Sequence, residues 1–312
     1  MRGIRSTQSS SSSLTDMAFT DILRCPLCGA GLERKENSLY CTGERRHCYD
    51  IASSGYVNLL PPGRGRNART GDDREMMKSR GAFLDRGCYG RISDRIASII
   101  SAYAESARKP CITVADCACG EGYHTCRILK ALAEKRVRTE VFGFDASKYG
   151  VSCGAKRSKK PDLFSDCSSG AYFAAANIFS LPVYGGSFDF ALSLFAPIAG
   201  DEMTRILKDD GKLIVASAGA HHLYELRCAL YDDVRLSSGT VRCPDGFVRD
   251  REETVSYREN LDKDSLLELY LMTPFSRKTS FADEAKLGKT DGLDVTVEVK
   301  ITVFSKKGRT DI

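Results

Sequence analysis

The stretch "CITVADCACGEGYHTCRILKALAEK" (residues 111–135) decides the fold class of this 312-residue chain. It opens with a short apolar run that is typical of a buried strand, and it closes with apolar residues at helical spacing. Between them lies a loop of small residues, which lets backbone N–H groups and the start of the following helix approach a ligand closely. The stretch therefore predicts a strand, a ligand-binding loop and a helix in succession.

Strand and helix patterns alternate on both sides of this stretch. Four further strand-like runs follow it, at 139–147, 171–178, 187–197 and 211–220. Helical spacing marks 201–210, and it marks 74–106 as two helices with a break near Gly87. This alternation predicts an α/β fold with a doubly wound, mostly parallel sheet. The strictly alternating run at 294–307 predicts an antiparallel pair or one long edge strand.

The composition is that of an ordinary globular chain. Hydrophobic residues make up 42% and charged residues 28%, and no apolar run approaches the roughly 18 residues that a membrane span needs. The net charge of +5 permits a polyanionic partner without requiring one. Thirteen cysteines, an odd number scattered along the chain, indicate a reducing compartment and not a disulfide framework. We therefore expect a cytoplasmic protein with no membrane partner.

Four cysteines and one histidine are clustered near the N-terminus. Cys25 and Cys28 form a C-x-x-C knuckle, Cys41 follows, and the pair His47 and Cys48 comes last. A knuckle places two thiolates on one tight turn, and a distant pair of ligands completes a tetrahedron around zinc. In so short a segment the metal replaces a missing core. The spacing predicts a zinc site but leaves His47 and Cys48 open as the fourth ligand.

The small-residue loop and the strands after it carry the residues expected around a nucleoside. Asp145 ends a strand where an acid hydrogen-bonds both ribose hydroxyls, and Asn177 follows the next strand, where an amide reads an adenine edge. The loop lacks the G-x-G-x-x-G spacing of dinucleotide-binding proteins. Instead "DCACGEG" (116–122) resembles the D-x-G-x-G-x-G pattern of class I methyltransferases. Ala118 replaces the first glycine, and at a positive φ an alanine would cost about 1 kcal/mol.

Seven motifs occur in the order that one known family has. They are "CPLCGAGLERKENSLYC", "HCYDIASSGYVNLLP", "GDDREMMKSRGAFLDRGCY", "CGEGYHT", "FGFDASK", "HHLYELRCALY" and "MTPF". With these motifs the chain resembles the RlmA (RrmA) family of 23S rRNA (guanine-N1)-methyltransferases, from about residue 22 to residue 305. The resemblance implies a class I (Rossmann-like) methyltransferase fold behind a small N-terminal zinc-binding module.

The resemblance also implies a set of site residues and two cofactors, zinc and S-adenosyl-L-methionine. The zinc ligands carried over from the family are Cys25, Cys28, Cys41 and His47. The cofactor contacts carried over are Tyr89, Gly120, Glu121 and His222, with Asp145 in the ribose role. Asp116 and Gly122, the first and last residues of "DCACGEG", complete the predicted cofactor-binding set.

A guanine N1 atom lies on the Watson–Crick edge, so an enzyme that methylates it acts on a loop base or extrudes the base from a stem. The resemblance implies a 23S rRNA hairpin as partner and a homodimer as assembly. Basic side chains near the zinc ligands and in the linker are candidates for phosphate contacts. They are Arg34, Lys35, Arg45, Arg46, Arg64, Arg66 and Arg69.

The segment "LFAPIAG" follows the fourth strand, where such enzymes place the acceptor. Phe195 is the candidate to stack on the guanine, and Pro197 the candidate to shape the pocket wall. The sequence does not identify the general base that would take the N1 proton. Two alternative functions stay open: a small-molecule methyltransferase of the same fold, and a non-catalytic RNA-binding paralogue, which Ala118 and Cys48 suggest.

The predicted organisation has four parts. They are a disordered tail (1–20), a zinc-binding RNA-recognition module (21–60), a linker with helices (61–110) and a methyltransferase domain that depends on S-adenosylmethionine (111–312).

Overall fold

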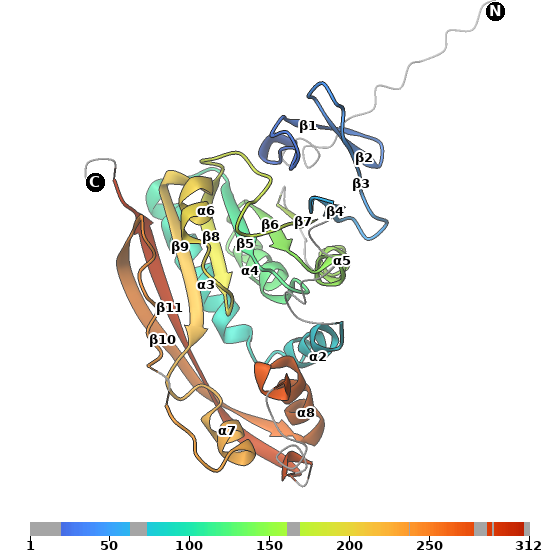
Figure 1. The fold of residues 1–312 in the computed structure, drawn as a ribbon. Coiled ribbons are helices and arrows are strands. Elements are labelled where there is room, and N and C mark those ends of the chain that lie inside the picture. The colour runs from blue at the N-terminus through green and yellow to red at the C-terminus, as the bar shows by residue number, and fades with distance from the viewer. Residues whose placement is uncertain are drawn as a thin grey trace, which may run out of the picture.

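The computed structural model describes residues 20–62, 74–160, 169–236, 238–277, 286–288 and 290–308. Within these ranges a small N-terminal sheet lies against one end of a large twisted sheet flanked by helices (Figure 1). The predicted tail, apart from its last residue, lies outside the described residues. The linker arginines Arg64, Arg66 and Arg69 lie outside them as well.

The large sheet has eight strands in the order β10-β11-β9-β8-β5-β6-β7-β4. Their bounds are β4 (Val57–Asn58), β5 (Ile112–Cys117), β6 (Thr139–Asp145), β7 (Gly170–Ala175), β8 (Phe188–Leu194), β9 (Leu207–Ala218), β10 (Phe247–Asp262) and β11 (Gly292–Lys306). The six strands from β4 to β9 are parallel to their neighbours, and β10 and β11 are antiparallel. The chain order reverses at β5, which lies between β6 and β8. This topology confirms the predicted doubly wound, mostly parallel sheet.

Each face of the parallel strands is buried by a different set of elements, because successive side chains in a strand point to opposite faces. Val114 packs in one apolar cluster with α3 (Gly90–Ala107) and α4 (Tyr123–Glu134). Its neighbour Ala115 packs in a second cluster with α6 (Gly200–Ile206) and with Leu39 of the N-terminal sheet. The N-terminal module therefore buries apolar side chains against a face of the large sheet.

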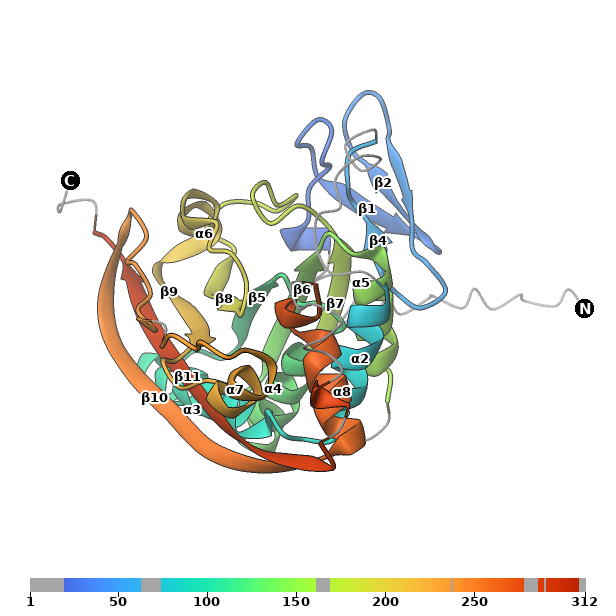
Figure 2. The same cartoon turned by 60° about the horizontal axis from the view of Figure 1, so that its bottom comes forward.

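Helices flank the large sheet. The predicted pair of helices in 74–106 is confirmed as α2 (Arg74–Asp85) and α3, with Gly87 between them at a φ of +89°. α5 (Lys148–Arg157) packs on β6 and β7, α7 (Tyr224–Leu230) packs on β11, and α8 (Lys263–Met272) lies beside α2 (Figure 2). No helix among the described residues is both long enough and apolar enough to cross a bilayer.

The N-terminal module is a three-stranded antiparallel sheet of β1 (Leu32–Lys35), β2 (Ser38–Cys41) and β3 (Cys48–Asp50). Its chain then enters the large sheet, because β4 pairs in parallel with β7. Backbone contacts at Leu23, which bridges to Val183, and at Arg24, whose N–H donates to Pro182 O (2.9 Å), join the two parts further.

Two predicted elements are wrong in detail. The helix expected over 201–210 ends at Ile206, and β9 begins at Leu207, because Leu207 and Leu213 are both buried in the same cluster of the core. The run at 294–307, predicted as an antiparallel pair or one long edge strand, is one long strand, but it does not lie at the edge. β11 pairs on both sides, and the edge is β10, which the sequence analysis missed. Most of its residues are polar and exposed, a common protection of sheet edges.

Candidate zinc site and cofactor cavity

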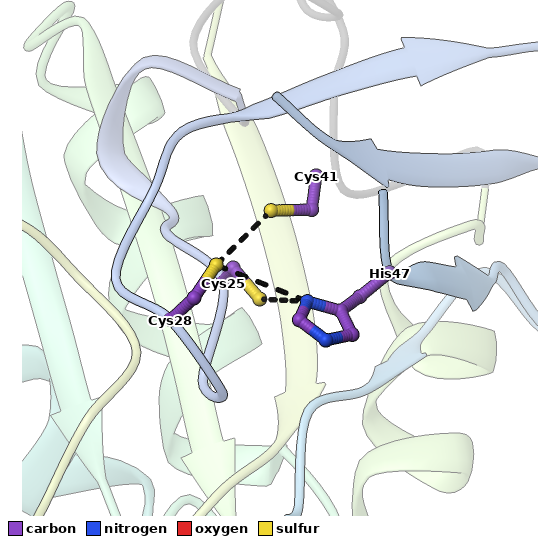
Figure 3. A group of neighbouring side chains, drawn as sticks. All are labelled: Cys25, Cys28, Cys41 and His47. Atoms are coloured by element: carbon purple, nitrogen blue, oxygen red, sulfur yellow. Dashed lines mark hydrogen bonds between the residues drawn. The ribbon is translucent and has the colours of Figure 1, made fainter. Parts of the chain in front are cut away.

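Three cysteines and one histidine of the N-terminal module converge on one point (Figure 3). The Sγ atoms of Cys25, Cys28 and Cys41 and a ring nitrogen of His47 all lie within 4.8 Å of one another. Cys25 Sγ is 3.4 Å from His47 Nδ1, and Cys28 Sγ is 3.3 Å from Cys41 Sγ. Zinc–sulfur bonds of about 2.3 Å in a tetrahedron require ligand separations of about 3.7 Å. The donor set and its spacing fit a tetrahedral zinc ion.

The backbone places these ligands. Gly29, with a φ of +75°, turns the chain so that its N–H donates to Cys25 O (2.8 Å) and closes the knuckle. Cys41 ends β2, where its N–H donates to His47 O (2.8 Å). Burial by itself would raise the pKa of Cys25. Hydrogen bonds to its sulfur, including that from the Tyr49 hydroxyl (3.1 Å), outweigh burial and lower this pKa to about 6. The thiolate is the form that binds metal.

Cys48 lies apart from this cluster. It begins β3 opposite Tyr40, its side chain is exposed, and its Sγ lies 4.0 Å from Asp50 Oδ1. It does not belong to the group of four converging ligand atoms. His47 precedes β3 and Cys48 is the first residue of that strand, and only the His47 side chain reaches the other three ligand atoms.

A cavity of about 510 Å³ opens at the carboxyl ends of the parallel strands, beside the point where the strand order reverses. Nine of the ten residues predicted for cofactor and acceptor line it: Tyr89, Asp116, Gly120, Glu121, Asp145, Asn177, Phe195, Pro197 and His222. Ligands bind at this place in open α/β sheets. The fold thus brings together residues that are up to 133 positions apart in the chain.

Gly122 is the exception and does not line the cavity. It precedes α4 with a φ of +78°, and a Cβ there would lie 2.6 Å from Gly154 Cα. It therefore shapes the loop by letting α4 and α5 approach each other. Sequence reasoning grouped Gly122 with the ligand contacts because the motif does not separate packing glycines from contacting ones.

The loop is held by the acid at the end of β6. Gly120 N–H donates to Asp145 Oδ2 (2.9 Å), and Ser147 N–H donates to Asp145 Oδ1 (2.7 Å). Ala118 has the expected positive φ, +72°, which is the left-handed region that alanine rarely adopts. Asn177 lines the cavity and also forms a turn, since its Oδ1 accepts from Phe179 N–H (3.1 Å).

Two acids below the loop are almost completely enclosed. Burial raises the pKa of Asp116 to about 7, although Thr125 donates to its Oδ2 (2.5 Å). Burial also raises the pKa of Glu121, against the opposing effect of the Arg157 and Arg80 guanidinium groups. Within the described part of the chain, Glu121 Oε1 has no hydrogen-bond partner. An enclosed acceptor without a donor fits a cationic ligand group such as the ammonium of S-adenosylmethionine.

Three aromatic rings cluster in the wall of the cavity. Tyr89 Oη lies 3.1 Å from His222 Nε2, and His222 Nδ1 accepts from Glu298 N–H (3.2 Å). Burial lowers the pKa of His222 to about 4, so its ring is neutral and Nε2 carries the proton that Tyr89 accepts. Phe195 lies beside both rings, with its ring centroid 6.0 Å from that of Tyr89 and 6.0 Å from that of His222. Its φ of +54° and its 41% exposure present the ring to the opening.

The polar cavity residues that were not predicted from the sequence include His124 and Arg80. His124 is part of the motif "CGEGYHT" and Arg80 is part of "GDDREMMKSRGAFLDRGCY", so both residues belong to motifs shared with the family. Only their position in a helix pattern was noticed, because helical spacing does not reveal which polar side chain turns toward a distant strand end.

A sheet of this topology, with a small-residue loop over β5 and an acid ending β6, defines a class I methyltransferase that uses S-adenosylmethionine, here joined to a zinc ribbon. Residues 23–66 match the zinc-ribbon family described as RlmA, N-terminal, and residues 109–264 match a methyltransferase domain family.

Two curated relatives carry the comparison further. The Bacillus subtilis (strain 168) protein YxjB, a candidate 23S rRNA (guanine-N1)-methyltransferase, is 31% identical over 294 residues, which cover 91% of this chain and 97% of YxjB. The 23S rRNA (guanine(748)-N1)-methyltransferase of Streptomyces fradiae is 32% identical over 209 residues, 67% of each chain. The chain belongs to the RlmA family of 23S rRNA (guanine-N1)-methyltransferases, which confirms the resemblance.

Proposed function

We propose that this protein methylates N1 of a guanine in a hairpin loop of 23S rRNA, using S-adenosylmethionine. The observation that carries the proposal is the joint presence of a Cys3His cluster and the cavity in a chain similar to YxjB over 97% of that relative. A small-molecule methyltransferase would need no zinc ribbon beside its cavity.

Zinc is held by Cys25, Cys28, Cys41 and His47, and its role is structural, because four protein ligands leave no open position. The ion fixes β1 to β3, whose surface carries Arg34 and Lys35 in β1 and Arg45 and Arg46 before β3. These side chains are exposed, and they contact RNA phosphates, which position the RNA without reading its sequence.

S-adenosylmethionine supplies an electrophilic methyl group when it is bound, and this chain positions the acceptor against it. Each carboxylate oxygen of Asp145 accepts one backbone N–H, from Gly120 or Ser147, and its second lone pair accepts a hydrogen bond from a ribose hydroxyl. Asn177 contacts the adenine edge through its NH2, since its carbonyl holds the turn. Phe195 stacks on the guanine at the opening of the cavity, and Pro197 shapes its wall. Tyr89 and His222 line the cavity beside Phe195.

The decisive experiment incubates zinc-replete protein and labelled S-adenosylmethionine with a 23S rRNA transcript, followed by primer extension. A methyl group on guanine N1 blocks base pairing, so reverse transcription should stop one position before the product. Asp145→Ala should lose cofactor binding in isothermal titration calorimetry and lose the stop. Cofactor binding with label only on small molecules would favour the small-molecule alternative. Absence of cofactor binding by folded wild-type protein would leave an RNA-binding paralogue.

The protein works in the cytoplasm as a homodimer. The cytoplasm is where rRNA substrate and reduced zinc-binding thiolates coexist. A dimer would present two basic zinc ribbons to one RNA. Light scattering coupled to size exclusion, with and without the rRNA hairpin, measures the mass, and a mass of 34.3 kDa for the free protein at micromolar concentration would contradict the dimer.

A further inference from the structure

His124 is a titratable side chain of the cavity to which neither the sequence motifs nor the cofactor contacts assign a role. It lies in the first turn of α4, directly behind the cofactor loop, and it lines the cavity. Its Nδ1 lies 2.8 Å from Ser93 Oγ, a fully buried hydroxyl on α3. Its ring centroid lies 6.3 Å from that of Phe195 at an interplanar angle of 36°. The imidazole is thus held at one nitrogen, next to the acceptor candidate.

The other nitrogen of His124 is available. Among the described residues Nε2 has no hydrogen-bond partner, and it is not one of the enclosed atoms without partners. His124 as a whole is only partly buried. Because Nδ1 is held by Ser93 and the ring lines the cavity, Nε2 is the atom that a bound base can reach.

The other groups of the cavity that could take a proton are less suitable. Both nitrogens of His222 are engaged, by Glu298 N–H and by Tyr89. Both oxygens of Asp145 accept backbone N–H groups, and Thr125 donates to Asp116. Glu121 Oε1 also lacks a partner within the described ranges, but it is enclosed and suits the cationic ammonium of S-adenosylmethionine rather than the neutral base. His124 alone of these combines an open nitrogen with a fixed orientation.

We infer that His124 is the catalytic residue that removes the N1 proton of the guanine, an inference that rests on the proposed function. Nδ1–H donates to Ser93 Oγ, which leaves the Nε2 lone pair facing the base. As the N1 electron pair forms a bond to the methyl carbon, the carbon–sulfur bond breaks and its electron pair stays on sulfur. The N1 proton passes to His124 Nε2. The products are N1-methylguanine, S-adenosylhomocysteine and an imidazolium ion, so charge and protons balance.

The surroundings keep this imidazole neutral before the reaction. Burial is the largest cause that lowers the pKa of His124 to about 4, and the guanidinium groups of Arg80 on α2, Arg127 on α4 and Arg157 on α5 contribute to the same shift. The uncharged groups that pack against the ring are Ser93 and the rings of Tyr123 and Phe195. A neutral ring at pH 7 can accept a proton, and the same cations drive that proton out to solvent afterwards.

The test compares His124→Asn with His124→Gln. Asn keeps a polar atom near Nδ1 for Ser93 and removes the group at Nε2, whereas Gln restores a polar but non-basic group near Nε2. Single-turnover methylation of the rRNA transcript is measured from pH 6.5 to 9, together with the Kd for S-adenosylmethionine and for RNA. Both variants should lose about a hundredfold or more in rate at pH 7, with each Kd within about threefold of wild type.

The pH profile separates a proton acceptor from a structural residue. Wild type should be nearly independent of pH over this range. Without a base, only guanine that has lost its N1 proton to solvent reacts, so the variant rates should rise roughly tenfold per pH unit. A uniform loss at every pH, or a loss confined to cofactor affinity, would overturn the inference. Ser93→Ala should lower the rate less than His124→Asn.

The outcome also separates this inference from the proposed function. Wild-type protein that methylates guanine N1, with His124→Asn equally active, would retain the function and discard His124 as the base. Wild-type protein that binds S-adenosylmethionine but leaves rRNA unmodified would remove both.

Discussion

At the scale of single residues, the cofactor loop holds an alanine in a conformation suited to glycine. Ala118 has a φ of +72° and its N–H donates to Phe144 O (2.8 Å), so the fold and not the residue sets this conformation. The strain is of the order of 1 kcal/mol and lies in a loop that lines the cavity. It weakens the non-catalytic alternative, because the loop keeps its shape with alanine in place.

Ala118→Gly should therefore stabilise the protein. Glycine relieves the left-handed strain, and we expect the free energy of unfolding in urea to rise by about 0.5–1 kcal/mol. Ala131→Gly, in the interior of α4, is the matched control and should lower it by about the same amount, because helical φ suits alanine. A loss of stability in both variants would mean that Ala118 is not strained.

At the scale of secondary-structure elements, the cavity depends on how closely α4 and α5 approach. Gly122 at the start of α4 and Gly154 in α5 meet where any added Cβ would lie 2.6 Å from the other backbone or 2.5 Å from the Phe173 ring. Gly150, one turn earlier in α5, similarly approaches Gly120 O. Glycines thus form the contacts of α5 with α4 and with the cofactor loop, and these contacts hold the loop in place.

Gly122→Ala should lower the free energy of unfolding by more than the strain of an alanine at positive φ explains. Gly87, between α2 and α3, has a similar φ of +89° but nothing within 4 Å of its added Cβ, so Gly87→Ala measures the backbone strain by itself. We expect about 1 kcal/mol for Gly87→Ala and about 2–4 kcal/mol for Gly122→Ala in urea unfolding, the difference being overpacking. Equal losses would show that α4 and α5 have room to separate.

At the scale of the whole molecule, the zinc ribbon is a part of the α/β core. Leu23, Leu32 and Leu39 pack in the same cluster as Phe142 and Phe144 on one face of the large sheet. β4 extends that sheet beyond β7. Order in the ribbon is thereby linked to the edge of the large sheet at β7.

Zinc removal should consequently destabilise the zinc ribbon strongly and the adjoining edge of the large sheet less. After chelation, we expect hydrogen exchange to increase strongly over 20–60 and moderately in β7 and at 181–184, where the ribbon is bonded, while β5, β8 and β9 stay protected. Cys41→Ser should bind less than one zinc per chain and show the same pattern. Cys48→Ser is the control and should retain one zinc, as measured by metal analysis. Loss of zinc in Cys48→Ser would contradict the assigned ligand set.

The sequence by itself determined the five strands β5 to β9, the helices α2 to α4, the zinc-binding cysteines and the cofactor loop, because each is a local pattern of spacing. It left His47 and Cys48 open, and only the positions of their ligand atoms in the folded module separate them. It also missed β10, whose charged exterior hides its pairing with β11.

Only the tertiary structure decided which polar residues share the cavity. Tyr89 and His222 meet, and His124 turns toward Phe195, through contacts between elements far apart in the chain. Helical spacing reports which face of α4 is apolar, but it does not report what lies opposite a polar position in its first turn. That depends on how the sheet twists and how closely the helices pack, and both are properties of the assembled core.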